Sequence, residues 1–192
     1  PLDSTGADPA LLHRVRDTLH SDLEWTNLFD FVSDSNISAL DTGADFYNVN
    51  YAEWGLTGAA FLLKLGYRVV GGNLVMEVLL FDLPGQKKIF STRYEHPIAN
   101  HTRLVHTIAD DVLRELTGEN GLFSTRILMV CRKGKSKEVY IADSDGGQFT
   151  ELTHDKSIAL SPSWSPNGKT ISYSQFEWRF DPQSQTKKLI PV

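Results

Sequence analysis

Residues 161–173 read Ser-Pro-Ser-Trp-Ser-Pro-Asn-Gly-Lys-Thr-Ile-Ser-Tyr, which places a turn sequence between two segments that can form strands. Ser165 can hydrogen-bond to the backbone of the turn, and Pro166 presets the first central dihedral angle of a type I turn. Asn167 suits the second central position, and Gly168 accepts a positive φ. The stretch therefore predicts a tight β-hairpin.

The chain after Gly121 repeats this pattern of short strands and turns, without a helical periodicity. The strand candidates, besides the strand that contains Trp164, are residues 126–132, 138–143, 149–153 and 170–176. Turns rich in Gly, Asp, Asn and Ser separate them. Regularly spaced short strands of this kind are typical of a sandwich, a barrel or a propeller.

Two aromatic residues, Trp164 and Tyr173, flank the hairpin and are expected to pack between neighbouring sheets. The whole stretch is interpreted as structural, so it is assigned no direct functional role. The residues of this structural signature are Trp164, Pro166, Asn167, Gly168 and Tyr173.

The part before Gly121 contains helices. Asp8 can cap free N–H groups and Pro9 suits the first helical position, so a helix is expected over residues 9–21. Apolar residues at helical spacing predict a second helix over 98–116, which Gly118 would close in the left-handed conformation.

Apolar runs with Gly and Pro between them predict an antiparallel meander in the same part of the chain. Its strands are expected at 59–67, 74–83 and 88–94, with a further short strand at 28–31 and a short helix at 51–56. The sequence thus predicts an α+β domain over 1–120, with helices on one side of an antiparallel or mixed sheet, followed by an all-β portion over 121–192.

The hairpin pattern, Trp-Ser-Pro-Asn-Gly-Lys-x-Ile-x-Tyr, resembles the repeated blade signature of TolB-type propellers. Residues 138–147 and 149–152 look like the blade strand, Asp-Gly turn and next strand of that family. The blade signature also occurs in other propellers, including those fused to serine peptidases. The helix-to-strand junction, 113–118 leading into 121–127, is what resembles the TolB family itself, and the resemblance covers nearly the whole chain.

The resemblance implies a six-bladed β-propeller that is incomplete in this chain. Only 24 residues follow Gly168, fewer than the blade period of about 40 residues, so 121–192 would be a first blade and the start of a second. We therefore expect a fragment, or a chain from which segments have been removed, with 177–180 as one such place. The chain also looks as if it begins at the end of the family's first strand, without the segment that contacts TolA.

Charge and composition narrow the classes of partner. Residues 1–120 hold 9 Lys and Arg against 17 Asp and Glu, whereas 126–192 hold 10 against 7. An acidic first part matches a phosphate backbone poorly, so nucleic acid is not an expected partner. No apolar run approaches the roughly 20 residues that a membrane crossing needs, and the single cysteine, Cys131, neither indicates nor excludes an oxidising compartment.

No catalytic, cofactor or metal site is expected. His96, His101 and His106 are spaced by five, which places them on different faces of a helix, so solvated or capping roles are expected for them. Asp110 and Asp111 are adjacent and do not face one another on a helix. No Gly-x-Ser-x-Gly elbow and no phosphate-binding loop occurs.

The resemblance implies a non-catalytic scaffold of the Tol-Pal system in the bacterial periplasm. Such a protein binds the peptidoglycan-associated lipoprotein Pal and communicates with TolA, and thereby supports protein transport, outer-membrane integrity and cell division. The candidate protein-binding connection, whose alternative is an ordinary exposed loop, consists of His154, Asp155, Lys156, Ser157 and Ile158.

Two other classes remain open at this point. One is the gating propeller of a serine peptidase whose catalytic domain is absent from the chain. The other is a propeller that binds an outer-membrane component or a polysaccharide.

Overall fold

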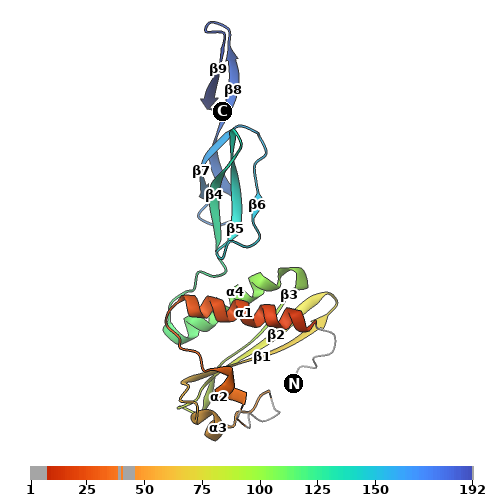
Figure 1. The fold of residues 1–192 in the computed structure, drawn as a ribbon, viewed down its shortest axis with the longest axis vertical. Helices are drawn as coiled ribbons and strands as arrows, with labels where there is room; N and C mark the ends of the chain where they lie inside the picture. The colour runs from red at the N-terminus through yellow and green to blue at the C-terminus, as the bar shows by residue number, and fades with distance from the viewer. Residues whose placement is uncertain (1–7, 39, 41–45, 192) are drawn as a thin grey trace. The chain divides into compact units, whose positions relative to one another are not determined.

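The computed structural model describes residues 8–38, 40 and 46–191. The chain divides into two compact units, 1–124 and 125–192. The first contains the helices and a three-stranded sheet, and the described residues of the second, 125–191, form strands and no helix (Figure 1). The expected remnant of a first strand at the N-terminus lies outside the described residues.

Helix α1 (Pro9–Trp25) begins as the sequence predicts. The Asp8 carboxylate accepts a hydrogen bond from the backbone N–H of Ala10 at 2.9 Å. The helix continues four residues beyond the expected end because Leu23, one turn after Leu19, extends the buried stripe. Burial of an apolar face by neighbouring elements, rather than local propensity, fixes this end of the helix.

The expected strand at 28–31 is wrong. These residues have no regular structure, and no strand within the described residues pairs with them. Phe29 packs on the core and the Phe31 ring lies 4.0 Å from the His20 ring, so side-chain contacts hold this stretch in place of a backbone ladder. Helix α2 (Asp34–Ser38) follows it.

The meander is confirmed. Strands β1 (Phe61–Val70), β2 (Asn73–Asp82) and β3 (Lys87–Pro97) form an antiparallel sheet in that order. Between β1 and β2, Val70 pairs with Asn73, which leaves a two-residue turn. Gly71 and Gly72 both have positive φ there, as such a turn requires.

Both faces of β2 are covered, because successive side chains point to opposite faces. Met76 and Leu80 pack with α1 and with α4 (His101–Thr117), the two long helices on one face. On the other face, Trp54 of α3 (Tyr51–Gly55) packs with Leu79 and Phe81. The two long helices therefore lie on one side of the sheet as expected, and the predicted short helix α3 closes the other side.

Helix α4 follows a 3-10 turn, η1 (Ile98–Asn100), and so begins later than the predicted helix at 98–116. Its end is as predicted, since Gly118 adopts φ 79° and donates its N–H to the Arg114 carbonyl at 2.8 Å. Within α4, Asp110 binds the stretch of chain that follows the helix. Its carboxylate accepts the N–H groups of Phe123 at 2.8 Å and Ser124 at 2.9 Å.

The second unit contains β4 (Arg126–Lys133), β5 (Ser136–Asp143), β6 (Thr150–Glu151), β7 (Ile158–Trp164), β8 (Ile171–Asp181) and β9 (Thr186–Pro191). The sheet order is β4-β5-β7-β8-β9, and β6 pairs with β5. Residues 177–180, which the sequence indicated as a place where a segment had been removed, continue β8 and pair with β9. The predicted strand at 149–153 is shorter in the structure, because only Thr150 and Glu151 pair with β5.

Candidate protein-binding site

Residues 154–157 form the second part of the connection between β6 and β7, which spans 152–157. His154, Asp155 and Lys156 are exposed, and Lys156 adopts a positive φ of 53°. The expectation of a five-residue loop is wrong at its end. Ser157 is buried and donates its hydroxyl to the Phe176 carbonyl, and Ile158 already belongs to β7, where it pairs with Phe176.

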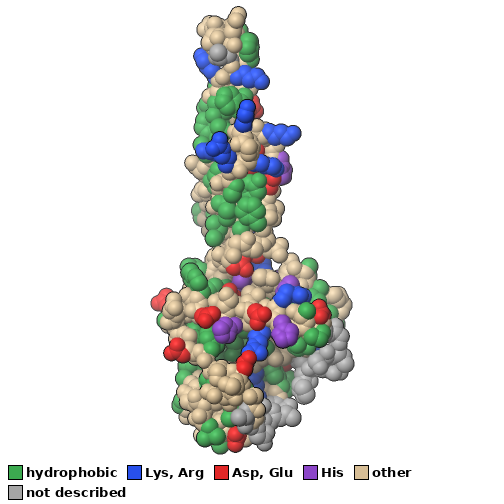
Figure 2. Space-filling model, viewed as in Figure 1, with side chains coloured by type: hydrophobic (Ala, Val, Ile, Leu, Met, Phe, Trp, Pro, Cys, Tyr) green, Lys and Arg blue, Asp and Glu red, His purple; other side chains and the backbone are tan. Residues whose placement is uncertain are grey.

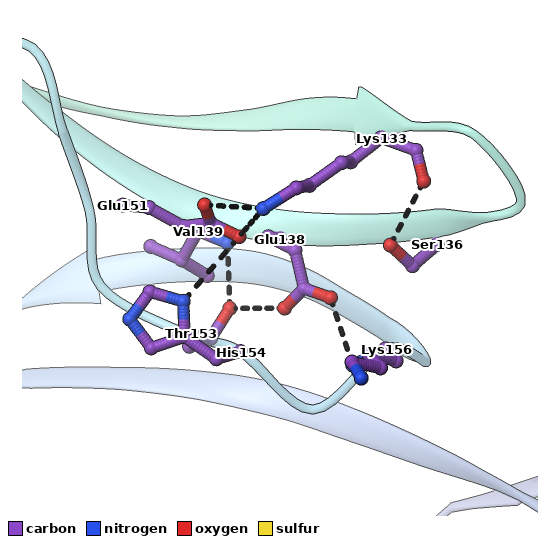
Figure 3. A network of polar contacts seen from close by, with 8 residues as sticks. All are labelled: Lys133, Ser136, Glu138, Val139, Glu151, Thr153, His154 and Lys156. Atoms are coloured by element: carbon purple, nitrogen blue, oxygen red, sulfur yellow. Dashed lines mark hydrogen bonds and ion pairs between the residues drawn. The ribbon is translucent and has the colours of Figure 1, made fainter.

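A buried carboxylate fixes this connection (Figure 3). Glu138 of β5 is 2% exposed, and its two oxygens accept the Thr153 hydroxyl at 2.7 Å and the Lys156 backbone N–H at 3.0 Å. The Thr153 hydroxyl also accepts the Val139 N–H at 2.9 Å. Because a buried carboxylate needs such donors, the contacts hold the connection at both ends against β5.

The role of Glu138 was not predicted from the sequence. Its signal is a carboxylate within the strand run Glu-Val-Tyr-Ile-Ala. This signal does not identify the contacts, because the two residues that donate hydrogen bonds to the carboxylate lie 15 and 18 positions further along the chain.

A charged cluster lies beside this network. The Lys133 ammonium donates to both oxygens of Glu151, at 2.7 and 3.0 Å, and His154 Nδ1 lies 3.4 Å from the same carboxylate. The hydrogen bond from Lys133 lowers the pKa of Glu151 below its ordinary value. Figure 3 shows the Lys133 and His154 side chains both directed at the Glu151 carboxylate.

The turn between β4 and β5 belongs to the same end of the sheet. Lys133 pairs with Ser136 across a two-residue turn, and the Ser136 hydroxyl donates to the Lys133 carbonyl at 3.0 Å. The next residue, Lys137, donates its N–H to the Ser157 carbonyl at 2.8 Å. The turn and the 154–157 connection are therefore neighbours.

The hairpin signature adopts the predicted turn. Gly168 has φ 66° and donates its N–H to the Ser165 carbonyl at 2.9 Å, while the Asn167 side chain accepts the Lys169 N–H at 3.0 Å. Pro166 occupies the exposed first central position. The turn geometry accounts for these residues in full.

The two aromatic residues of the signature differ in burial. Trp164 ends β7 and is partly covered, with the Arg126 guanidinium 5.1 Å from the ring centroid. Tyr173 in β8 is 38% exposed. Since β7 runs from Ile158 at one end of the sheet to Trp164 at the other, the structure does not bring the signature and the 154–157 connection together.

The three spaced histidines occupy different environments. His96 lies in β3, and His101 Nδ1 lies 3.0 Å from the Ile98 carbonyl. The expectation of a solvated or capping role is wrong for His106, which is 1% exposed with Nδ1 2.7 Å from Asp22 Oδ2. Within the described residues no group of His, Cys, Asp and Glu is arranged to hold a metal ion.

Comparison with known proteins relates both units to one family. The sequence model described as "TolB beta propeller domain" matches residues 113–186. The Tol-Pal system protein TolB of Syntrophotalea carbinolica is 32% identical over 177 residues, which are 89% of this chain and 40% of that protein. That of Dechloromonas aromatica is 34% identical over 174 residues, 88% of this chain and 39% of that protein. The chain belongs to the TolB family.

A solved structure agrees in fold. The crystal structure of TolB from Acinetobacter baumannii superposes with a TM-score of 0.74 at 21% identity, over 100% of this chain and 48% of that one. The all-β unit is therefore an incomplete part of a TolB β-propeller, with an open sheet. The α+β unit precedes it.

The chain spans about 40% of the length of the curated TolB relatives that it matches. Both relatives carry the name Tol-Pal system protein TolB, so the comparisons do not favour the peptidase alternative. No helix among the described residues combines the length and apolarity that a membrane crossing requires.

Proposed function

We propose that this chain is part of a non-catalytic, protein-binding scaffold of the Tol-Pal system in the periplasm. Its partner at the all-β unit is the peptidoglycan-associated lipoprotein Pal, and a link to a TolA-like inner-membrane protein belongs to the same proposal. The scaffold would serve outer-membrane integrity, protein transport and cell division. It needs no cofactor.

The observation that carries the proposal is the exposed segment 154–156 in a TolB propeller unit. Glu138 holds this segment through the Thr153 hydroxyl, just before it, and the Lys156 N–H, at its end, so the segment presents His154, Asp155 and Lys156 in one conformation. A pre-ordered segment loses less conformational entropy on binding than a flexible one. Loops held on a rigid β scaffold are a common place for protein recognition.

The experiment exchanges the two charges, as Asp155→Lys with Lys156→Asp, and measures Pal affinity together with Tm. Net charge is kept, and both side chains are exposed, so Tm should stay unchanged while affinity falls about tenfold or more, in the range of a contact charge pair. The matched control is Lys169→Gln in the turn at the opposite end of the sheet. Unchanged Pal affinity in the exchanged variant would remove the segment from the interface.

A further inference from the structure

The chain contains two Asn-Gly dipeptides, Asn120-Gly121 and Asn167-Gly168. In such a dipeptide the backbone nitrogen of glycine can attack the side-chain amide carbon of asparagine, because glycine has no Cβ to obstruct the approach. The reaction requires that both groups can move into attack geometry. The surroundings of each dipeptide therefore decide where the reaction occurs.

The hairpin turn holds both reacting groups of the second dipeptide. The Gly168 N–H donates to the Ser165 carbonyl at 2.9 Å, so the nucleophile is engaged within the turn. The Asn167 side-chain oxygen accepts the Lys169 N–H at 3.0 Å and lies 2.8 Å from the Ser165 hydroxyl. Attack by Gly168 on Asn167 would require these contacts to break first.

The first dipeptide carries no such restraint. Asn120 is exposed, and within the described residues neither its side-chain amide nor the Gly121 N–H takes part in a hydrogen bond. The dipeptide lies between the end of α4 and the Phe123 N–H that Asp110 binds, in a stretch without regular structure. The Asn120 side chain is therefore free to rotate toward the Gly121 nitrogen.

Packing against α4 requires glycine at position 121. A Cβ there would meet the Asp110 carboxylate and would lie 2.8 Å from Asp110 Cα, which is a backbone atom. A larger residue would displace the chain from the helix, because protein interiors leave no room for an added methyl group at such a contact. The close contact thus places a glycine directly after the unrestrained Asn120.

We propose that Asn120 is a site of spontaneous deamidation, whereas the turn protects Asn167. The Gly121 nitrogen bonds to Cγ of Asn120, the bond from Cγ to the side-chain nitrogen breaks, and ammonia leaves with the proton of the Gly121 N–H. Water then opens the resulting succinimide at either carbonyl, which yields aspartate or isoaspartate. The reaction consumes water alone and transfers no electrons. The inference is independent of the proposed partner.

Deamidation changes the charge and the backbone at this position. Either product adds a negative charge to the α+β unit, in which residues 1–120 already hold 17 Asp and Glu against 9 Lys and Arg. Figure 2 shows acidic side chains spread over the face of this unit that is in view. Isoaspartate also carries the side-chain methylene into the main chain, directly before the contact of Gly121 with Asp110. The modified protein should therefore elute later from an anion exchanger than the parent.

The test measures both sites in one sample by peptide mapping. Trypsin cleaves after Lys and Arg, so the peptide 115–126 carries Asn120 and the peptide 157–169 carries Asn167. The purified 192-residue chain is incubated at mildly alkaline pH, and mass spectrometry follows the replacement of the amide nitrogen by oxygen. Deamidation should be about tenfold or more faster at Asn120, with isoaspartate among the products.

Unfolding provides the control, because it removes the turn that protects Asn167. In denaturant the two rates should agree within about twofold, since an unfolded chain retains only fluctuating local structure. Ser165→Ala removes the hydroxyl beside Asn167 Oδ1, so it should speed deamidation of Asn167 in the folded chain about threefold to tenfold, the factor equivalent to one hydrogen bond. Asn120→Gln should abolish the signal from the peptide 115–126.

Three results would overturn the inference. The first is an equal rate at the two sites in the folded chain, or a faster rate at Asn167. The second is aspartate as the sole product at Asn120, because direct hydrolysis of the amide would then replace attack by Gly121. The third is an unchanged ratio of the two rates in denaturant, since the sequence around each site, and not the fold, would then distinguish them.

Discussion

The two units reach stability in different ways. In the α+β unit, both faces of the meander are covered, and the central strand β2 is buried through Val78 and Leu79, each 0% exposed. Among the described residues of the all-β unit, Val139, Ala142 and Ala159 are the buried apolar ones, while Trp178 and Phe180 are 53% and 61% exposed. The first unit closes its core within itself, whereas the second leaves apolar faces open, as a part of a larger β-structure does.

Buried polar contacts also have different structural roles in the two units. In the α+β unit the buried polar groups, such as His106 with Asp22 and Asp110 with the 123–124 backbone, connect elements that the apolar core already holds. In the all-β unit Glu138 holds a connection between two strands, through Thr153 and Lys156. The comparison predicts that core truncation is most damaging in the first unit, and polar truncation most informative in the second.

The largest effect is expected from Ile108→Ala. Ile108 is 0% exposed in α4, between α1 and the sheet, so its loss leaves a cavity and should lower the free energy of unfolding of the first unit by about 2–5 kcal/mol. Hydrogen exchange resolved by peptide should show faster exchange in α1, α4 and β2. Equal acceleration in β4 and β5 would contradict the separation of the two units.

A smaller effect is expected from Glu138→Ala. The change leaves the Thr153 hydroxyl and the Lys156 N–H without their acceptor, which should cost about 1–3 kcal/mol. Exchange at residues 153–157 should accelerate while the first unit is unaffected. Glu138→Gln is the matched control, because its amide oxygen can accept one of the two bonds, and it should lie between the parent and the alanine variant.

A pH-dependent effect is expected at Tyr94 in the first unit. Burial raises the pKa of Tyr94 well above its ordinary value, and its hydrogen bond to Asp111, at 2.6 Å, adds to the rise. Because the folded-state pKa is the higher one, the contribution is complete below about pH 10, the ordinary tyrosine pKa, and is lost as pH rises further. Denaturant unfolding is measured from about pH 9 to about pH 11, on both sides of the ordinary tyrosine pKa. The free energy of unfolding should decline less steeply with pH for Tyr94→Phe than for the parent.

The smallest effect is expected from Trp178→Ser and Phe180→Ser. Both side chains are more than half exposed, so each change should alter the free energy of unfolding by about 0.5 kcal/mol or less. Thermal unfolding followed by circular dichroism provides the measurement. A loss as large as that of Ile108→Ala would show that this hairpin carries a core of its own, and would remove the contrast between the units.

Local chemistry made several elements predictable from the sequence. Asp8 and Gly118 mark helix ends, and Gly168 marks the hairpin turn, because each satisfies a backbone requirement within a few residues of itself. The meander is predictable for the same reason, since Gly71 and Gly72 form its tight turn. The resemblance to TolB also rests on such local runs.

The candidate site was predictable only in part. Asp155 and Lys156 are exposed as a connection between strands should be, but Ser157 and Ile158 were misplaced because the register of β7 against β8 decides where the strand begins. The strand expected at 28–31 failed for a similar reason: a strand exists only where another pairs with it.

The sequence by itself determined the hairpin turns, the start of α1, the end of α4 and the family to which the chain belongs. The tertiary structure alone decided that His106 is buried against Asp22, 84 positions away, and that Glu138 reaches Thr153 and Lys156. It also decided that the Lys133 ammonium binds the Glu151 carboxylate, 18 positions away. The physical reason is range: a turn or a cap is satisfied by neighbours in sequence, whereas a buried charge and an ion pair between distant residues depend on groups that only the folded chain brings together.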